Sequence, residues 1–178
     1  NGSTPLHEAS RNGRDKIVEI LLQSGAQIDI QDKSGQTPLY EAATRGHDKI
    51  VEILLQSGAQ IDIQDKFGDT LLHEASRKGR DKIVEILLKR GAQIDIKDMN
   101  GSTPLYEASR YGRDKIVEIL LQNGVTIDLR DNNGETAMHI AIEKGRTEVI
   151  QLLIDAGSSL DVKNKVHTLS ILNRNMLI

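Results

Sequence analysis

The chain repeats itself every 33 residues, and this period constrains its fold more than any other feature of the sequence. Residues 13–33 and 46–66 are identical except that Arg14 in the first copy is His47 in the second. A glycine followed two residues later by a threonine recurs in five registers, at Gly2, Gly35, Gly68, Gly101 and Gly134. Such self-similarity predicts a linear stack of units, each of which buries its apolar face only against a neighbour.

Local rules predict two helices in each unit. In the first unit, Thr4 is a typical helix N-cap, and Pro5 suits the first helical position, where its missing N–H costs nothing. Gly13 ends this helix. A second helix is expected over about residues 15–24, because an aspartate opens it and five aliphatic side chains form a broad apolar stripe. Gly25 ends the second helix.

The remainder of each unit predicts a β-hairpin that projects from the helices. Ile28 and Ile30 alternate with polar residues, which is the periodicity of a strand. An Asp-x-x-Gly turn follows at residues 32–35 and is typical of a tight reversal. Each unit is therefore predicted to be helix, helix, hairpin.

The beginnings of the units also carry a family signature. The stretches STPLHEA at residues 3–9 and QTPLYEAA at residues 36–43 resemble the ankyrin-repeat signature, and ILLQSGAQID supports the resemblance. The resemblance covers about residues 1–165. It implies an all-α solenoid, in which stacked helix-turn-helix-β-hairpin repeats form a curved, right-handed array.

The resemblance also gives the organisation of the chain. We expect a single domain over residues 1–178, with repeats at about 1–33, 34–66, 67–99, 100–132 and 133–165. The last stretch, 166–178, keeps no clear Thr-Pro-Leu-His sequence. It is expected to be an irregular C-terminal cap, with a short helix from Leu169 to Leu172, or a truncated repeat.

The repeats depart from the signature at a few positions. Leu71 and Ala137 occupy the proline position, which should weaken helix preorganisation without preventing the helix. Tyr40 and Tyr106 replace the signature histidine. A series of glutamates predicts an unusually polar first-helix surface until Ile140 breaks it; these residues are Glu8, Glu41, Glu74 and Glu107.

Charge and composition argue against several classes of function. A formal net charge of −3 and a pI of about 6.0 provide no general field that would attract nucleic acid, so we expect no nucleic-acid partner. No apolar run approaches the roughly 20 residues that cross a bilayer, so we expect no membrane insertion. The sequence has no cysteine, which excludes thiolate chemistry and suits an intracellular, cytoplasmic setting. The chain is expected to be a monomer.

The candidate catalytic and metal-binding residues are spread along the repeats. His7, His73 and His139 occupy equivalent positions two repeats apart, so packed helices place them roughly 20 Å from each other. Zinc ligands must lie about 2 Å from one ion, so we interpret these histidines as hydrogen-bonded structural residues. One aspartate per repeat is likewise predicted to be a turn or hydrogen-bond anchor, at Asp29, Asp62, Asp95, Asp128 and Asp161. We predict no enzymatic activity, no metal site and no cofactor.

The positions that vary between near-identical copies predict a binding site. They concentrate at the hairpin tips and at the ends of the first helices, which should lie on one face. Phe67 is the only phenylalanine and lies in a turn, and Met99 and Tyr111 add apolar area, so we expect these three as central contacts. The predicted partner-binding residues are Lys33, Arg45, Phe67, Asp69, Arg77, Lys78, Met99, Ser102, Arg110 and Tyr111.

Arginines near these positions are spaced for pairing with the glutamate series. Arg11, Arg45, Arg77 and Arg110 lie three or four residues from a glutamate, so many are expected to form ion pairs worth about 0.3–0.5 kcal/mol each. Such pairs would set specificity more than affinity. Neutral drift at unconstrained surface positions is the alternative explanation for the variation.

The resemblance implies a concave face of hairpin tips and first helices that holds protein partners. Our hypothesis is a non-catalytic protein–protein interaction scaffold for a peptide or protein. Two alternatives stay open. In the first alternative, the array is a regulatory or spacer segment of a larger enzyme or channel. In the second, it is an artificial or recently amplified array with no selected ligand.

Overall fold

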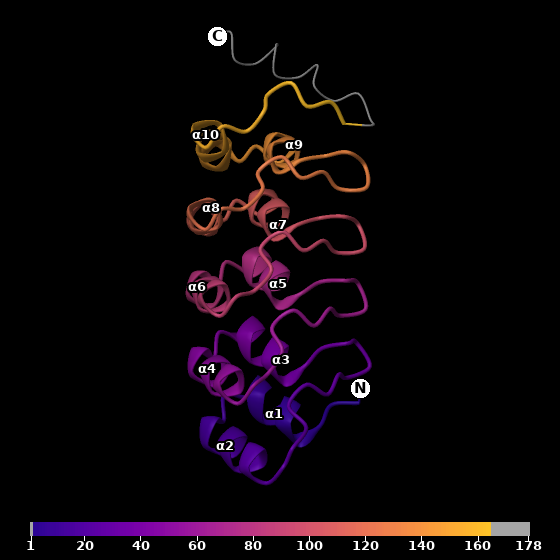
Figure 1. Ribbon diagram of the computed structural model, residues 1–178, viewed down its shortest axis with the longest axis vertical. Helices are drawn as coiled ribbons and strands as arrows, with labels where there is room; N and C mark the ends of the chain where they lie inside the picture. The colour runs from indigo at the N-terminus through magenta and orange to yellow at the C-terminus, as the bar shows by residue number, and fades with distance from the viewer. Residues whose placement is uncertain (1, 165–178) are drawn as a thin grey trace.

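The computed structural model describes residues 2–164, and within them the chain folds into ten α-helices stacked in consecutive pairs (Figure 1). The first helices of the pairs are α1 (Pro5–Arg11), α3 (Pro38–Arg45), α5 (Leu71–Lys78), α7 (Pro104–Arg110) and α9 (Ala137–Glu143). The second helices are α2 (Asp15–Gln23), α4 (Asp48–Gln56), α6 (Asp81–Lys89), α8 (Asp114–Gln122) and α10 (Thr147–Asp155). The pairs follow chain order, so the fold is the all-helical, solenoid-like stack that the period predicts. The cap expected over residues 166–178 lies outside the described residues.

Threonine side chains begin the first helices. Thr37 accepts a hydrogen bond from the Tyr40 N–H at 3.2 Å, as an N-cap residue should. In α5 the cap is reciprocal, because the Thr70 N–H also donates to the His73 ring at 3.1 Å. α5 and α9 begin with Leu71 and Ala137, which confirms that the fold tolerates the loss of proline there.

The core runs through the whole stack between the two layers of helices. One valine of each second helix is completely buried, at 0% exposure, and these residues are Val18, Val51, Val84, Val117 and Val149. Leu54, Leu87 and Leu120 are likewise 0% exposed. Burying a valine or leucine side chain stabilises a fold by about 1.5–3 kcal/mol. The aliphatic stripe of one repeat is thus covered by the next.

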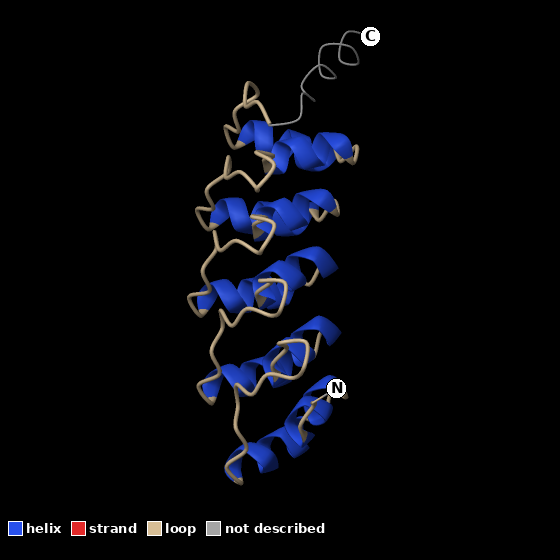
Figure 2. Cartoon of the chain, turned by 90° about the vertical axis from the view of Figure 1, so that its right-hand side faces the viewer, coloured by secondary structure: helices blue, strands red, loops and turns tan. Residues whose placement is uncertain are grey.

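The projecting segments are tight turns that stack in a column beside the helices in Figure 1 and face the viewer in Figure 2. The Asp32 N–H donates to the Gln36 carbonyl at 2.9 Å, and the Asp32 carboxylate accepts the N–H groups of Ser34 and Gln36. Within residues 2–164 no β-strand forms, so the predicted hairpins are present as loops closed by the expected Asp-x-x-Gly turn. Their polar groups bond mainly to other turn residues and to the adjacent repeat.

Hydrogen bonds also join each turn to the next one along the stack. The Met99 N–H donates to the Phe67 carbonyl at 3.0 Å, and the Asn132 N–H donates to the Asn100 carbonyl at 2.9 Å. Gly68 has a φ of 79°, and a Cβ there would lie 2.8 Å from the Met99 backbone nitrogen. Glycine therefore permits both the turn and the close approach of its neighbour.

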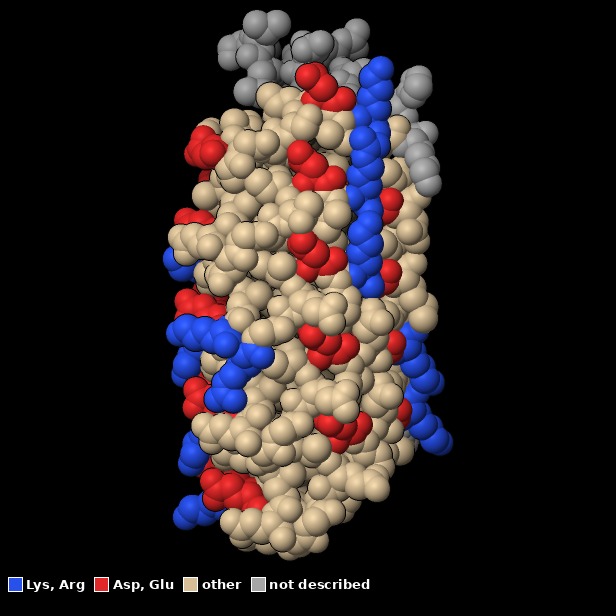
Figure 3. All heavy atoms as spheres, in the orientation of Figure 1, with Lys and Arg blue, Asp and Glu red and all other residues tan. Residues whose placement is uncertain are grey.

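One face of the stack carries a column of acidic side chains along most of its length, with a basic column beside the upper part of it (Figure 3). Four of the repeating aspartates accept a backbone N–H of the following repeat, as Asp29 does from Gln60 at 3.0 Å; these are Asp29, Asp62, Asp95 and Asp128. This confirms the anchoring role predicted for these four aspartates. Lys97 donates to the Arg130 carbonyl at 2.7 Å and so also joins two repeats.

Candidate functional site

Three of the predicted contact residues are exposed apolar side chains on the turns and first helices. Phe67 is 69% exposed, Met99 is 68% exposed and Tyr111 is 39% exposed. Phe67 and Met99 lie in adjacent turns, whose backbones are hydrogen-bonded to each other at these two residues. Large exposed apolar side chains are characteristic of binding surfaces when they gather in one place. The turns of the central repeats therefore carry a candidate contact area.

The other predicted residues differ in accessibility. Asp69 is 6% exposed and Ser102 is 5% exposed, so neither side chain offers much area to a partner. Arg77 keeps 26% of its side chain exposed. Lys78 is exposed and lies 3.7 Å from Glu74. The remaining predicted residues, Lys33, Arg45 and Arg110, are exposed.

Arg77 ties the turns to the first helices. Its Nη2 donates to Asp69 of the turn at 2.9 Å, its Nη1 to Glu74 of α5 at 2.7 Å, and its Nε to Glu107 of α7 at 2.8 Å. Burial by itself lowers the pKa of Arg77, but the hydrogen bonds and charges of Glu107 and Asp69 outweigh burial and raise that pKa. A permanently charged guanidinium thus holds one turn and two first helices in a fixed relation.

The same contact recurs at the first junction of the stack. Arg11 donates to Glu41 of the next repeat through Nε at 3.0 Å and through Nη2 at 2.5 Å, and to Glu8 of its own helix at 2.7 Å. Such two-pronged pairing is the strong geometry for arginine and carboxylate. The sequence predicted ion pairs within one helix but not these pairs between residues 30 positions apart. At Arg11 the pair between repeats is the more buried one, because Glu41 is 7% exposed and Glu8 is 51% exposed.

Two expectations about charge need correction. The first-helix surface is not unusually polar, because Glu41, Glu74 and Glu107 are only 5–8% exposed, covered by the neighbouring repeat and paired with arginine. Only Glu8, at the start of the stack, keeps a largely exposed side chain, at 51%. The second correction concerns Arg45 and Arg110. Neither forms an ion pair with any residue in 2–164.

The equivalent histidines are structural, as predicted. The His73 ring accepts from the Thr70 N–H through Nδ1, and its Nε2 lies 3.1 Å from the Ser102 carbonyl of the next repeat. His7 does the same with Thr4 and with the Gln36 carbonyl at 3.0 Å. These rings therefore cap a helix and link two repeats. Residues 2–164 contain no group of three or more His, Cys, Asp or Glu side chains placed to hold a metal ion.

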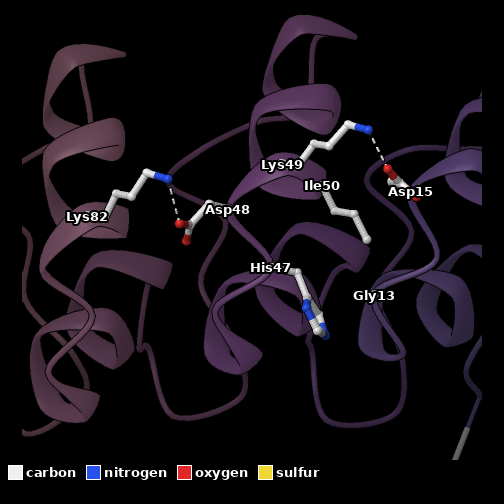
Figure 4. Close-up of a pocket in the computed structure, with 7 residues that line it drawn as sticks. All are labelled: Gly13, Asp15, His47, Asp48, Lys49, Ile50 and Lys82. Carbon is white, nitrogen blue, oxygen red and sulfur yellow. Dashed lines mark hydrogen bonds and ion pairs between the residues drawn. The ribbon is translucent and has the colours of Figure 1, made fainter.

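A shallow pocket opens where the second helices begin (Figure 4). Its cations are already paired, Lys49 with Asp15 and Lys82 with Asp48. The His47 Nε2 lies 3.1 Å from the Arg11 carbonyl, and its ring packs so closely on Gly13 that a Cβ there would lie 2.8 Å away. Since its polar groups join neighbouring repeats, this pocket has a structural use.

A stack of helix pairs with projecting turns, held together by contacts between successive units, defines the class of helical repeat proteins. The family model for ankyrin repeats in three copies matches residues 24–98 and 72–164, and the model for a single ankyrin repeat matches residues 1–33. The chain belongs to the ankyrin-repeat family. A search of the curated proteins found no match to the chain.

Ankyrin repeats are generally protein-interaction modules and are typically non-catalytic. Among the helices of residues 2–164, none is both long and apolar enough to cross a membrane.

Proposed function

We propose that the chain is a single, non-catalytic scaffold domain that binds a peptide or protein partner on the face formed by its turns and first-helix ends. The observation that carries this proposal is the exposure of Phe67 and Met99 on adjacent, hydrogen-bonded turns. An isolated exposed apolar residue needs no explanation, but two neighbouring large ones form contact area that a partner can desolvate. A monomer acting in a reducing, intracellular setting suits this role and the absence of cysteine.

The rigid frame beneath the face supports the same proposal. Arg77 fixes the turn at Asp69 to α5 and α7, so the exposed side chains of the central repeats are presented by a preorganised backbone. Preorganisation lowers the ordering cost of binding and so contributes to affinity without adding contacts. The ion pairs of Arg77 thus hold the backbone in place, while the exposed side chains of Phe67 and Met99 contact the partner.

A selection from a random-peptide library on the immobilised protein tests the proposal. We expect selected peptides to lose about tenfold or more in affinity for the Phe67→Ala variant, since anchors of this kind contribute at least about 2 kcal/mol. Tyr111→Ala should weaken binding in the same direction. Ile20→Ala is the matched control, because Ile20 is 59% exposed but lies on α2, away from the face.

The outcomes separate the proposal from its alternatives. Peptides that bind Phe67→Ala and Tyr111→Ala as tightly as the unaltered protein would remove these residues as anchors. Failure to select any peptide would favour a spacer segment or an array without a selected ligand. Equal losses for Ile20→Ala would mean that binding occurs elsewhere on the surface.

A further inference from the structure

The arginine at the last turn of the first helices has a partner at two junctions of the stack and lacks one at a third. Arg11 and Arg77 each donate to a glutamate 30 residues further on, Glu41 and Glu107. Thirty residues beyond Arg110 the chain has Ile140, which is 2% exposed and offers no acceptor. The arginine series therefore continues into the fourth repeat, while the glutamate series stops before the fifth.

The glutamate three residues before Arg110 is already engaged by another arginine. Arg11 and Arg77 each also pair with a glutamate three residues earlier in the same helix, and the equivalent residue for Arg110 is Glu107. Glu107 is 5% exposed and accepts the hydrogen bond of Arg77. Arg110 is thus an exposed guanidinium that forms no ion pair with a carboxylate of residues 2–164.

An aromatic ring restrains this free guanidinium. The Arg110 head group lies over the Tyr111 ring, 6.0 Å from the ring centroid, which is at the limit of cation–π contact. The planar guanidinium keeps its donors available to a carboxylate when it stacks on a ring. Tyr111 is itself 39% exposed, so the pair offers a cation and an apolar surface together.

Other exposed cations are less suited to receive a carboxylate. Lys97 and Arg130 donate to main-chain carbonyls of the following repeat, at 2.7 and 3.1 Å. Lys78 already lies 3.7 Å from Glu74. The cations near the second-helix starts, Lys49 and Lys82, are paired with aspartates. Arg110 combines exposure, lack of a carboxylate and a neighbouring aromatic ring.

We propose that Arg110, with Tyr111 beside it, recognises an aspartate or glutamate side chain of the bound partner. The partner carboxylate would take the role that Glu41 and Glu107 take toward Arg11 and Arg77. The partner is then an acidic segment in which an apolar residue lies close to the aspartate or glutamate. This apolar residue would contact the exposed side chains of the turns. This inference rests on the proposed function and adds the chemistry of the partner to it.

The test supplies the missing carboxylate from within the chain. In Ile140→Glu the new side chain stands where Glu41, Glu74 and Glu107 stand in the preceding repeats, so it should fold and pair with Arg110. Arg110→Gln removes the cation directly. Arg90→Gln is the control, because Arg90 is an exposed arginine at the C-terminal end of α6, and Ile140→Leu controls for a change of side chain at the buried position.

Peptides selected from the random library on the unaltered protein are the probe, synthesised with acetylated and amidated ends. We expect them to be enriched in aspartate and glutamate, and to lose about tenfold or more in affinity for both Ile140→Glu and Arg110→Gln. Replacing their acids by glutamine should cause a similar loss. Amidation removes the terminal carboxylate, so retained binding assigns recognition to a side chain.

Failure of this inference is distinguishable from failure of the proposed function. Selected peptides without acidic enrichment, or peptides that bind Ile140→Glu and Arg110→Gln normally but lose affinity for Phe67→Ala, would overturn the role of Arg110 alone. Loss of binding on amidation would overturn the side-chain assignment. Failure to select any peptide would overturn both proposals. If Ile140→Glu does not fold, the Arg110→Gln result decides.

Discussion

Replacing Arg77 by methionine removes the guanidinium that three mostly buried carboxylates contact. Asp69, Glu74 and Glu107 lie 2.9, 2.7 and 2.8 Å from its nitrogens, and their side chains are 8%, 11% and 7% exposed. Removing one partner of a fully buried ion pair costs about 3–5 kcal/mol, whereas an exposed pair is worth at most about 1 kcal/mol. Because 26% of the Arg77 side chain is exposed, we expect a loss of about 2–4 kcal/mol of unfolding free energy.

Urea unfolding followed by circular dichroism measures this loss, which should appear as a lower midpoint with an unchanged slope. The matched control is Arg110→Met, which removes an arginine at the equivalent position of the next repeat and should change stability by less than about 0.5 kcal/mol.

Two results would refute this reasoning. An Arg77→Met variant as stable as the unaltered protein would mean that the guanidinium is not needed to stabilise the three buried carboxylates. Equal losses for Arg77→Met and Arg110→Met would mean that the cost does not come from the three carboxylates that Arg77 contacts, because Arg110 forms no ion pair within residues 2–164.

Three further perturbations follow from the same contacts. His73→Leu should lower the free energy of unfolding by about 1–3 kcal/mol, because it leaves buried partners at Thr70 and Ser102 without hydrogen bonds. Denaturant unfolding should show a smaller loss for His139→Leu, because the Nε2 of His139 has no partner among the described residues. Gly58→Ala should cost about 1–2 kcal/mol of stability for its left-handed backbone alone. Gly68→Ala should cost more, because its Cβ would also lie 2.8 Å from the Met99 nitrogen. Equal shifts in the thermal unfolding temperature of the two variants would contradict this. Burial, helped by nearby acids, raises the pKa of Tyr40 and Tyr106 above 10, so the folded state favours the protonated phenols. Stability should therefore fall as the pH rises above about 10, and Tyr40→Phe should reduce that fall; an identical alkaline profile for the variant would contradict it.

The period and the local signals of the sequence predicted most of the fold. Thr37 and Thr70 begin helices because a threonine side chain can satisfy the backbone donors there, and this depends only on a few neighbouring residues. The strand expected from the alternation of Ile28 and Ile30 does not form. Alternation indicates which side chains can share a face, but strand formation also requires a row of backbone partners. The stacked turns use those backbone groups on one another and on side chains.

The site was less predictable because its contacts cross from one repeat to the next. Sequence spacing within a helix suggested that Arg110 would pair as Arg77 does, and it does not. The signal was nevertheless present in the sequence, since comparing positions 30 residues apart matches Arg11 with Glu41, Arg77 with Glu107, and Arg110 with Ile140. The burial of Asp69 could not be read in this way, because it depends on how the turn folds back onto α5.

Hydrogen exchange of the protein with and without a selected peptide tests the binding face most directly. The proposal predicts slower exchange on peptide binding at the turns over residues 65–69 and 98–102 and at the end of α7, with little change along the outer surfaces of α4, α6 and α8. Protection confined to those second helices, with the turns unchanged, would contradict it.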